Sequence, residues 1–273
     1  MTNGANGHAG KGIPKLSFRN VTKTFDGERQ NTLALSDFNL DIHPSEFVCL
    51  VGPSGCGKTT ALNLAAGFIR PDSGQVLLDG KPVEKPGPDR AVVFQEHALF
   101  PWMTVRKNIE FALEMIKKPQ AERKIITNFY LKLVRLDTFE HSYIHELSGG
   151  MKQRVQIARS LAIAPAVYLM DEPFAALDAL TRDELYEEIQ RILAQTKQTV
   201  LFITHNIREA VILGDRVVVM AGANPGRVRT DFIVDLPRPR SFESPGVAQL
   251  ISKTMAALKA ENSPVEETPN GKA

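Results

Sequence analysis

A glycine-rich stretch, Gly52–Thr59, has the spacing G-x-x-x-x-G-K-S/T that binds nucleotide phosphates. The apolar run Phe47–Val51 precedes it and a helix-forming run follows it, a context that a mere glycine-rich connector does not need. Backbone N–H groups, the positive helix end and the ammonium of Lys58 all favour phosphate oxygens. We expect Thr59 to bind Mg²⁺ through its hydroxyl. The residues predicted to contact the nucleotide here are Gly52, Ser54, Gly55, Cys56, Gly57, Lys58, Thr59 and Thr60.

Two adjacent carboxylates, Asp171 and Glu172, come directly after the apolar run Val167–Met170. In open sheets of parallel strands, ligands lie beyond the carboxyl ends of the strands. Asp171 is therefore suited to hold Mg²⁺, and Glu172 to orient or deprotonate the water that attacks the terminal phosphate. An acidic pair in a solvated turn is the plain alternative, which the phosphate loop upstream disfavours.

Two single polar residues follow two further apolar runs. Gln95 comes after Ala91–Phe94, where its amide can bind Mg²⁺ or the attacking water, although this signal is weak by itself. His205 comes after Thr199–Thr204, where an imidazole can bridge the terminal phosphate and Glu172. The position of this histidine, taken alone, fits a structural role equally well.

A second anion site is predicted at Ser148-Gly149-Gly150, just before a helix that runs to about Ile163. Ser148 is a favourable N-cap residue, and the two glycines leave backbone N–H groups accessible at the positive end of the helix. An ordinary helix start is the alternative. Because the Ser-Gly-Gly turn occurs together with the phosphate loop, the sequence instead predicts two helix N-termini that bind phosphate in one chain.

These residues need a sheet to bring them together. Short apolar runs without polar alternation are typical of strands that are buried on both faces, as in parallel sheets. The chain has five such runs: Phe47–Val51, Ala91–Phe94, Val167–Met170, Thr199–Thr204 and Arg216–Met220.

Helix-forming stretches such as Thr59–Phe68 and Arg182–Ala194 separate the runs, so the fold class is α/β. Residues 15–46 and 74–84 alternate between apolar and polar and contain Asp-Gly turns, which predicts an antiparallel sheet beside the parallel one. The region from about 95 to 162 has no convincing strand and is predicted to be mostly helical.

The composition is that of a water-soluble protein without a strong overall field. The 33 basic and 31 acidic residues nearly cancel, so any anion site must be local and no nucleic-acid partner is expected. Cys49 and Cys56 are predicted to be reduced thiols. We find no signal peptide and no run of about 20 apolar residues, so the chain should touch a membrane only through a partner.

The stretch Leu147–Arg154, Leu-Ser-Gly-Gly-Met-Lys-Gln-Arg, resembles the signature of ABC ATPases. The resemblance covers about residues 16–235 and implies a P-loop NTPase (RecA-like) core with an antiparallel β subdomain and an α-helical subdomain. It also implies ATP and Mg²⁺ as cofactors, and ATP hydrolysis coupled to transport. The other motifs stand in the family's order: Gly52–Thr59, Gln95, Asp171-Glu172, Ala175–Asp178 and His205.

The resemblance further implies that two ATPase subunits, copies or homologues, face each other head to tail. ATP held on Lys58 of one would be covered by Ser148 and Gly150 of the other. Phe25 matches the aromatic that stacks on adenine in this family, and Asp178 the aspartate that contacts the second subunit.

Three stretches resemble importers of nitrate, alkanesulfonates, taurine and similar small anions: Phe94–Trp102, Glu172–Arg182 and Leu236–Arg240. Such importers imply transmembrane permease subunits, indirectly an extracytoplasmic solute-binding protein, and a place at the cytoplasmic face of the inner membrane. Asn206 departs from the aspartate that usually follows the histidine, which leaves the hydrogen bonding of that loop open.

An apolar set after Gln95 is predicted to be exposed and to receive a short helix of the permease, with a place in the core as the alternative. It consists of Leu99, Phe100, Trp102 and Val105.

Two other functions compete with transport. A soluble ABC ATPase acting on nucleic acid or ribosomes usually has coiled-coil insertions or two cassettes, and this sequence has neither. An inactive nucleotide sensor would lack Lys58 or Glu172. The predicted domains are a disordered amino terminus at 1–13, an ATPase domain at 14–240 with its helical subdomain at about 96–162, and a carboxyl-terminal helix with a disordered tail at 241–273.

Overall fold

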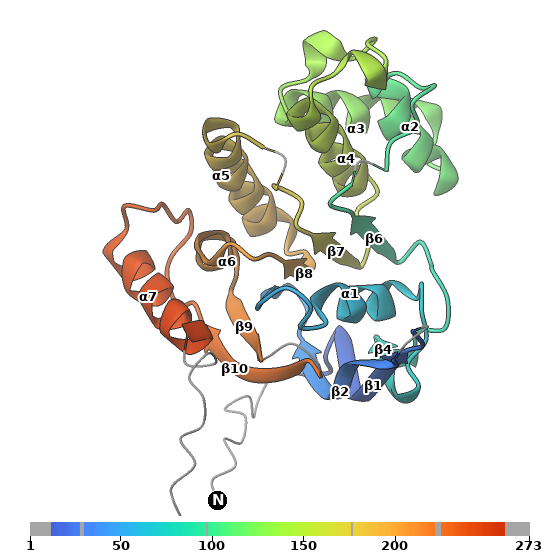
Figure 1. Cartoon of the computed structure of the whole chain (residues 1–273). Coiled ribbons are helices and arrows are strands. Elements are labelled where there is room, and N and C mark those ends of the chain that lie inside the picture. The colour runs from blue at the N-terminus through green and yellow to red at the C-terminus, as the bar shows by residue number, and fades with distance from the viewer. Residues whose placement is uncertain (1–11, 28–29, 97, 176, 222–224, 260–273) are drawn as a thin grey trace, which may run out of the picture.

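The chain folds around a six-stranded sheet of order β10-β9-β3-β8-β7-β6 (Figure 1). All neighbouring strands pair in parallel except β10, which is antiparallel to β9. The strands are β3 (Phe47–Val51), β6 (Arg90–Val93), β7 (Val167–Asp171), β8 (Thr199–Ile203), β9 (Arg216–Ala221) and β10 (Arg227–Ile233). The five predicted parallel strands are confirmed to within one residue at each end. This computed structural model describes residues 12–27, 30–96, 98–175, 177–221 and 225–259.

Helices cover both faces of this sheet (Figure 1). Helix α1 (Lys58–Ala66) lies on one face, while α5 (Ala179–Thr196) and α6 (Ile207–Leu213) lie on the other. Because successive side chains of a strand point to opposite faces, Val48 and Leu50 of β3 join the core beside α1, and their neighbours join the core beside α5 and α6. Burial on both faces explains why the strands are continuous apolar runs.

A second, antiparallel sheet of order β2-β1-β4-β5 packs on the α1 side. Between β4 and β5, Asp79 and Gly80 both have positive φ, 49° and 73°, as a two-residue hairpin requires. The predicted antiparallel sheet is confirmed, whereas the other predicted turn runs into residues 28–29, outside the described chain. The strands are β1 (Leu16–Phe25), β2 (Thr32–Ile42), β4 (Ser73–Leu78) and β5 (Lys81–Pro82).

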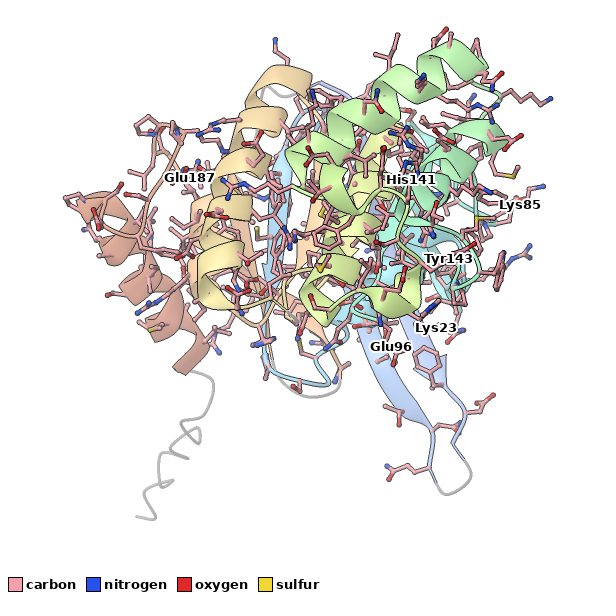
Figure 2. All side chains as sticks on the ribbon, turned by 90° about the horizontal axis from the view of Figure 1, so that it is seen from above. Lys23, Lys85, Glu96, His141, Tyr143 and Glu187 are labelled. Carbon is pink, nitrogen blue, oxygen red and sulfur yellow. The ribbon has the colours of Figure 1, made fainter. Side chains whose placement is uncertain are left out.

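A helical subdomain with its own core lies between β6 and β7 in the sequence. Figure 2, seen from above, shows it with His141 and Tyr143 on the side of the molecule opposite to the carboxyl-terminal helix. The mostly helical character predicted for this region is confirmed. Its elements are α2 (Val105–Met115), α3 (Gln120–Leu133), η1 (Asp137–Phe139), η2 (Ile144–Glu146) and α4 (Gly149–Ala162).

The predicted exposed apolar set is split by this subdomain. Leu99 is 9% exposed and Val105 is 0% exposed, and both belong to the helical core, so the prediction was wrong for these two. Val105 begins α2 directly after the N-cap Thr104 and turns inward against the other helices. Trp102 is 69% exposed and Phe100 is partly buried, so the aromatic members stay accessible.

The carboxyl-terminal segment returns to the main domain. Helix α7 (Pro245–Lys259) packs against α6 and β9, and Arg240, 5% exposed, binds carbonyl oxygens at the end of α6. Disorder was predicted for residues 1–13 and for the end of the chain from about residue 262. Residues 1–11 and 260–273 lie outside the described chain, which leaves this prediction untested there. No helix among the described residues is long and apolar enough to cross a membrane.

Candidate active site

The phosphate loop joins β3 to α1 and depends on glycine conformations. Gly57 has φ 89°, and a Cβ atom there would lie 2.6 Å from Cδ2 of Leu35 and 2.7 Å from the carbonyl oxygen of Ala34. No other residue fits this position without displacing β2. Cys56 is buried within the loop, and Cys49 and Cys56 are reduced thiols, as predicted.

Lys58 is held inside the loop. Its Nζ donates to the carbonyl oxygens of Gly52 and Pro53, both at 2.8 Å, and the residue is 8% exposed. The ammonium therefore points at the concave side of its own loop, where phosphate oxygens are the acceptors that it binds most strongly. Of the other predicted contacts, Ser54, Gly55 and Thr59 are exposed to an incoming ligand.

Thr59 and Asp171 connect the start of α1 to the end of β7. The Thr59 hydroxyl donates to Oδ2 of Asp171 at 3.1 Å. Burial raises the pKa of Asp171 and the charge of Glu172 adds to the shift, while the Thr59 hydrogen bond and the charge of Lys58 oppose it. A hydroxyl beside a carboxylate whose charge is poorly compensated is a pair of oxygen ligands suited to a hard divalent cation.

Glu172 and His205 meet beyond the ends of β7 and β8. Nδ1 of His205 lies 2.9 Å from Oε2 of Glu172. Glu172 has a left-handed backbone conformation, φ 45°, and its N–H donates to the carbonyl of Ile203 at 2.9 Å, which fixes where the side chain starts. The Glu172 side chain is 19% exposed and that of His205 is 69% exposed, so the pair opens to solvent. Such a pair can orient a water molecule and accept its proton.

Gln95 and Phe25 stand apart from these pairs. Both are exposed, and within the described chain no hydrogen bond joins Gln95 to Asp171 or Glu172. Phe25 ends β1 with its ring 41% exposed, and Nζ of Lys23 lies 5.8 Å from the ring centre. The roles predicted for these two residues stay predictions.

The Ser-Gly-Gly turn begins α4 as predicted. Oγ of Ser148 accepts a hydrogen bond from the backbone N–H of Met151 at 3.3 Å, and Gly149 and Gly150 form the first turn. Within the described part of this chain, no hydrogen bond links the turn to the phosphate loop. Its accessible N–H groups are thus available to a ligand held elsewhere.

Asp178 lies at the start of α5. Its Oδ1 accepts the backbone N–H of Thr181 at 3.0 Å, and this bond holds the pKa of the Asp178 carboxyl below its usual range. Asp178 is exposed and therefore accessible to a second subunit, while Ala176 in the same motif lies outside the described residues.

Two residues in the second half of α4 have contacts that sequence reasoning missed. Buried Gln156 donates through Nε2 to the carbonyl of Phe94 at 3.0 Å, and Arg159 donates to the carbonyl of Ala98. The Arg159 guanidinium also lies 5.4 Å from the centre of the Phe100 ring. Helix α4 thus holds the chain on both sides of Gln95. The partners are 62 and 61 residues apart, so no local spacing signals them.

The structure answers the question left by Asn206. Its Oδ1 accepts the N–H of Arg208 at 3.0 Å as the N-cap of α6, and its Nδ2 donates to Oε1 of Glu209 at 3.3 Å. Asparagine therefore keeps the cap that aspartate provides and adds a donor that aspartate lacks. Glu209 was not singled out from the sequence, although it lies only four residues after His205.

Parallel strands that bring a phosphate loop and an acidic pair to one edge of the sheet form the arrangement of P-loop NTPases. The model of the ABC transporter family matches residues 35–175 of this chain. The chain belongs to that family: it is an ATP-binding subunit of an ABC transporter and an ATPase coupled to transport.

Relatives match most of the chain. It is 51% identical over 228 residues to an ATP-binding protein of Brucella abortus, covering 84% of this chain and 86% of that one. It is 44% identical over 249 residues to the nitrate import ATP-binding protein NrtD of Synechococcus elongatus, covering 89% and 91%. A dimeric structure of the ATP-binding cassette MJ0796 with ADP and Pi superposes with a TM-score of 0.71 and 31% identity, over 83% of this chain and all of that one.

We predict that Glu172→Gln keeps ATP binding and lowers the rate of ATP hydrolysis by about 10²–10⁴, the range for loss of a general base. The amide keeps the shape of the side chain but cannot accept the proton of the attacking water. ATPase assays and nucleotide-binding titrations check the two halves of the prediction. Glu122→Gln, at an exposed glutamate of α3, is the control and should hydrolyse ATP normally. Near-normal turnover of Glu172→Gln would remove Glu172 from this role.

Proposed function

We propose that the chain energises uptake of a small anion of the nitrate type through a separate membrane permease. The observation that carries the proposal is its 44% identity, over 89% of the chain, to a protein named for nitrate import. Stretches Glu172–Arg182 and Leu236–Arg240 support the same group of importers, with taurine and alkanesulfonates as the other solutes. A position at the cytoplasmic face of the inner membrane and an extracytoplasmic solute-binding protein are parts of this proposal.

Within the site, we assign the phosphates of ATP to the loop around Lys58 and Mg²⁺ to Thr59 and Asp171, with Gln95 as a further ligand. Among the described residues no group of three or more His, Cys, Asp or Glu side chains is placed to hold a metal. This fits Mg²⁺, which usually takes one or two protein carboxylates and completes its coordination with phosphates and water. Bound there, Mg²⁺ would neutralise phosphate charge. Glu172, with His205 beside it, orients the water and accepts its proton.

The proposal includes a pair of ATPase subunits that complete each other's sites. The Ser148–Gly150 turn begins α4, and the N-terminus of a helix favours anions. In the described chain, no hydrogen bond joins this turn to the phosphate loop of the same subunit. A head-to-tail partner would bring this turn onto ATP bound at Lys58, and Asp178 would lie at the contact. The dimeric cassette that superposes on this chain supports the arrangement.

A mixing experiment tests the composite site. Lys58→Ala should lose ATP binding because it removes a full charge from the phosphate loop, and Ser148→Arg should block the turn that covers the partner's nucleotide. Each variant alone should be inactive, whereas an equimolar mixture should regain part of the wild-type ATPase rate, since one site per heterodimer is intact. A mixture no more active than its parents would refute the shared site.

The permease contact is assigned to an aromatic cluster at the start of the helical subdomain, formed by Phe100, Trp102 and Phe111. The ring of Phe100 lies 5.5 Å from that of Trp102 and 4.9 Å from that of Phe111. Phe111 also lines a cavity of about 530 Å³, together with Met103 and mainly charged residues of α2 and α3. An exposed aromatic beside a groove suits an amphipathic helix with an apolar anchor.

We expect Phe100→Ala combined with Trp102→Ala to reduce transport and copurification with the permease sharply. The isolated subunit should keep its fold and its basal ATPase rate, because the described cluster contacts none of the residues that bind phosphate. Phe129→Ala, at a 54% exposed aromatic of α3 outside the cluster, is the matched control and should transport normally. If the double variant unfolds or loses basal hydrolysis, the cluster is core and the permease binds elsewhere.

The solute is tested by uptake. Disruption of the gene for this chain in its own host should abolish uptake of nitrate from the medium. Expression of the wild-type chain should restore uptake, whereas expression of Glu172→Gln should not. If uptake of taurine or of alkanesulfonates is lost instead, the chain serves an importer of this group, but its solute is not nitrate. If uptake of all three anions is unchanged, the chain does not serve this group of importers.

A further inference from the structure

A buried carboxylate lies directly beneath the loop that carries His205. Glu209, in the first turn of α6, is 4% exposed. Three side chains donate hydrogen bonds to it: Thr204 to Oε2 at 2.6 Å, Tyr186 to Oε1 at 2.7 Å and Asn206 to Oε1 at 3.3 Å. Two of these donors are the residues immediately before and after the histidine.

The same hydroxyl that binds Glu209 also fixes the backbone. Oγ1 of Thr204 accepts the N–H of Asn206 at 2.9 Å while it donates to Glu209. The side chain of Asn206 in turn caps α6 through the N–H of Arg208. The side chains of the residues on both sides of His205, and the backbone N–H of Asn206 through Thr204, are therefore tied to one carboxylate. The imidazole itself is exposed and faces Glu172.

Every one of these contacts needs an acceptor at position 209. Burial and the nearby Glu209 charge raise the pKa of the Tyr186 phenol, so it stays protonated and donates. A threonine hydroxyl whose lone pair already binds a backbone N–H, and an asparagine NH₂ group, also approach as donors. Glutamine, a neutral side chain of the same shape, keeps an oxygen that can accept from Tyr186 and Asn206. Its NH₂ group can only donate, so the hydrogen bond with Thr204 would have to reverse its direction.

We propose that Glu209 is a positioning residue for ATP hydrolysis: it holds the 204–206 loop so that Nδ1 of His205 stays in hydrogen-bond contact with Glu172. This inference rests on the role proposed for His205. Burying a charge costs desolvation free energy, and in some proteins such a buried charge fixes one particular geometry. Here the geometry is the 2.9 Å contact between His205 and Glu172.

The test is Glu209→Gln, alone and combined with His205→Ala. We expect Glu209→Gln to lower kcat about 10- to 100-fold, as displacement of a reacting group by about 1 Å does, with KM for ATP unchanged within about twofold. In the His205→Ala chain, which is itself slow, the same substitution should cost nothing further, because there is no imidazole left to position.

Control variants separate positioning from stability. Tyr186→Phe removes one hydrogen bond from the same carboxylate without touching the loop, and should lower the melting temperature while kcat stays within about twofold of wild type. Thr204→Val removes the hydroxyl that links Glu209 to the backbone and should cause the same loss of kcat. This variant tests the proposal even if Glu209→Gln does not fold.

The outcomes are distinct. If Glu209→Gln and Thr204→Val lower kcat by the same factor with and without His205, or if both keep the wild-type kcat while His205→Ala is slow, the positioning role is wrong. If His205→Ala hydrolyses ATP at the wild-type rate, the role proposed for His205 is wrong instead.

Discussion

The parallel hydrogen bonding of β6, β7, β8, β3 and β9 is the constraint on which the site depends. Parallel strands end at the same edge, so the segments that follow them are neighbours although they are far apart in sequence. The register makes this exact to the residue: Leu50 and Asp171 both pair with Ile203, from opposite sides of β8. The phosphate loop, the two carboxylates and the histidine therefore all follow strands that end at the same position along the sheet. A shift of one residue in either pairing would turn each side chain to the wrong face.

Helix α4 relates this edge to the rest of the molecule. It begins at the Ser148–Gly150 turn, which is proposed to bind an anion. Further along, Gln156 binds the carbonyl of Phe94, and Arg159 contacts Ala98 and Phe100 of the aromatic cluster. One helix thus connects the Ser148–Gly150 turn, the segment around Gln95 and the aromatic cluster, which are separate in the sequence. Because all three contacts are made by one continuous helix, a displacement of its amino end would also displace Gln156 and Arg159.

The sequence was sufficient for the parts of the structure that depend on local pattern. Continuous apolar runs predicted the parallel strands, and the polar residues directly after them included Asp171, Glu172 and His205, because strand direction fixes where such residues lie. Lys58 was located by the spacing of the phosphate-loop motif. Burial of Val105 was not predictable in this way, since it depends on which helices pack against α2. The partners of Gln156 and Glu209 were also missed, because each contact is made between elements whose packing no periodicity encodes.

Buried Arg240 gives the carboxyl-terminal segment a firm attachment. Its guanidinium binds carbonyl groups at the end of α6 and that of Val234, and Gln190 of α5 holds its backbone N–H and C=O. The opposite end of α6 follows His205 directly. A protein module joined after α7 would therefore be attached through Arg240 to α6, the helix that follows His205. A force on that module would act on the edge of the sheet that carries Glu172 and His205. A module joined before β1 would hang from the antiparallel sheet instead.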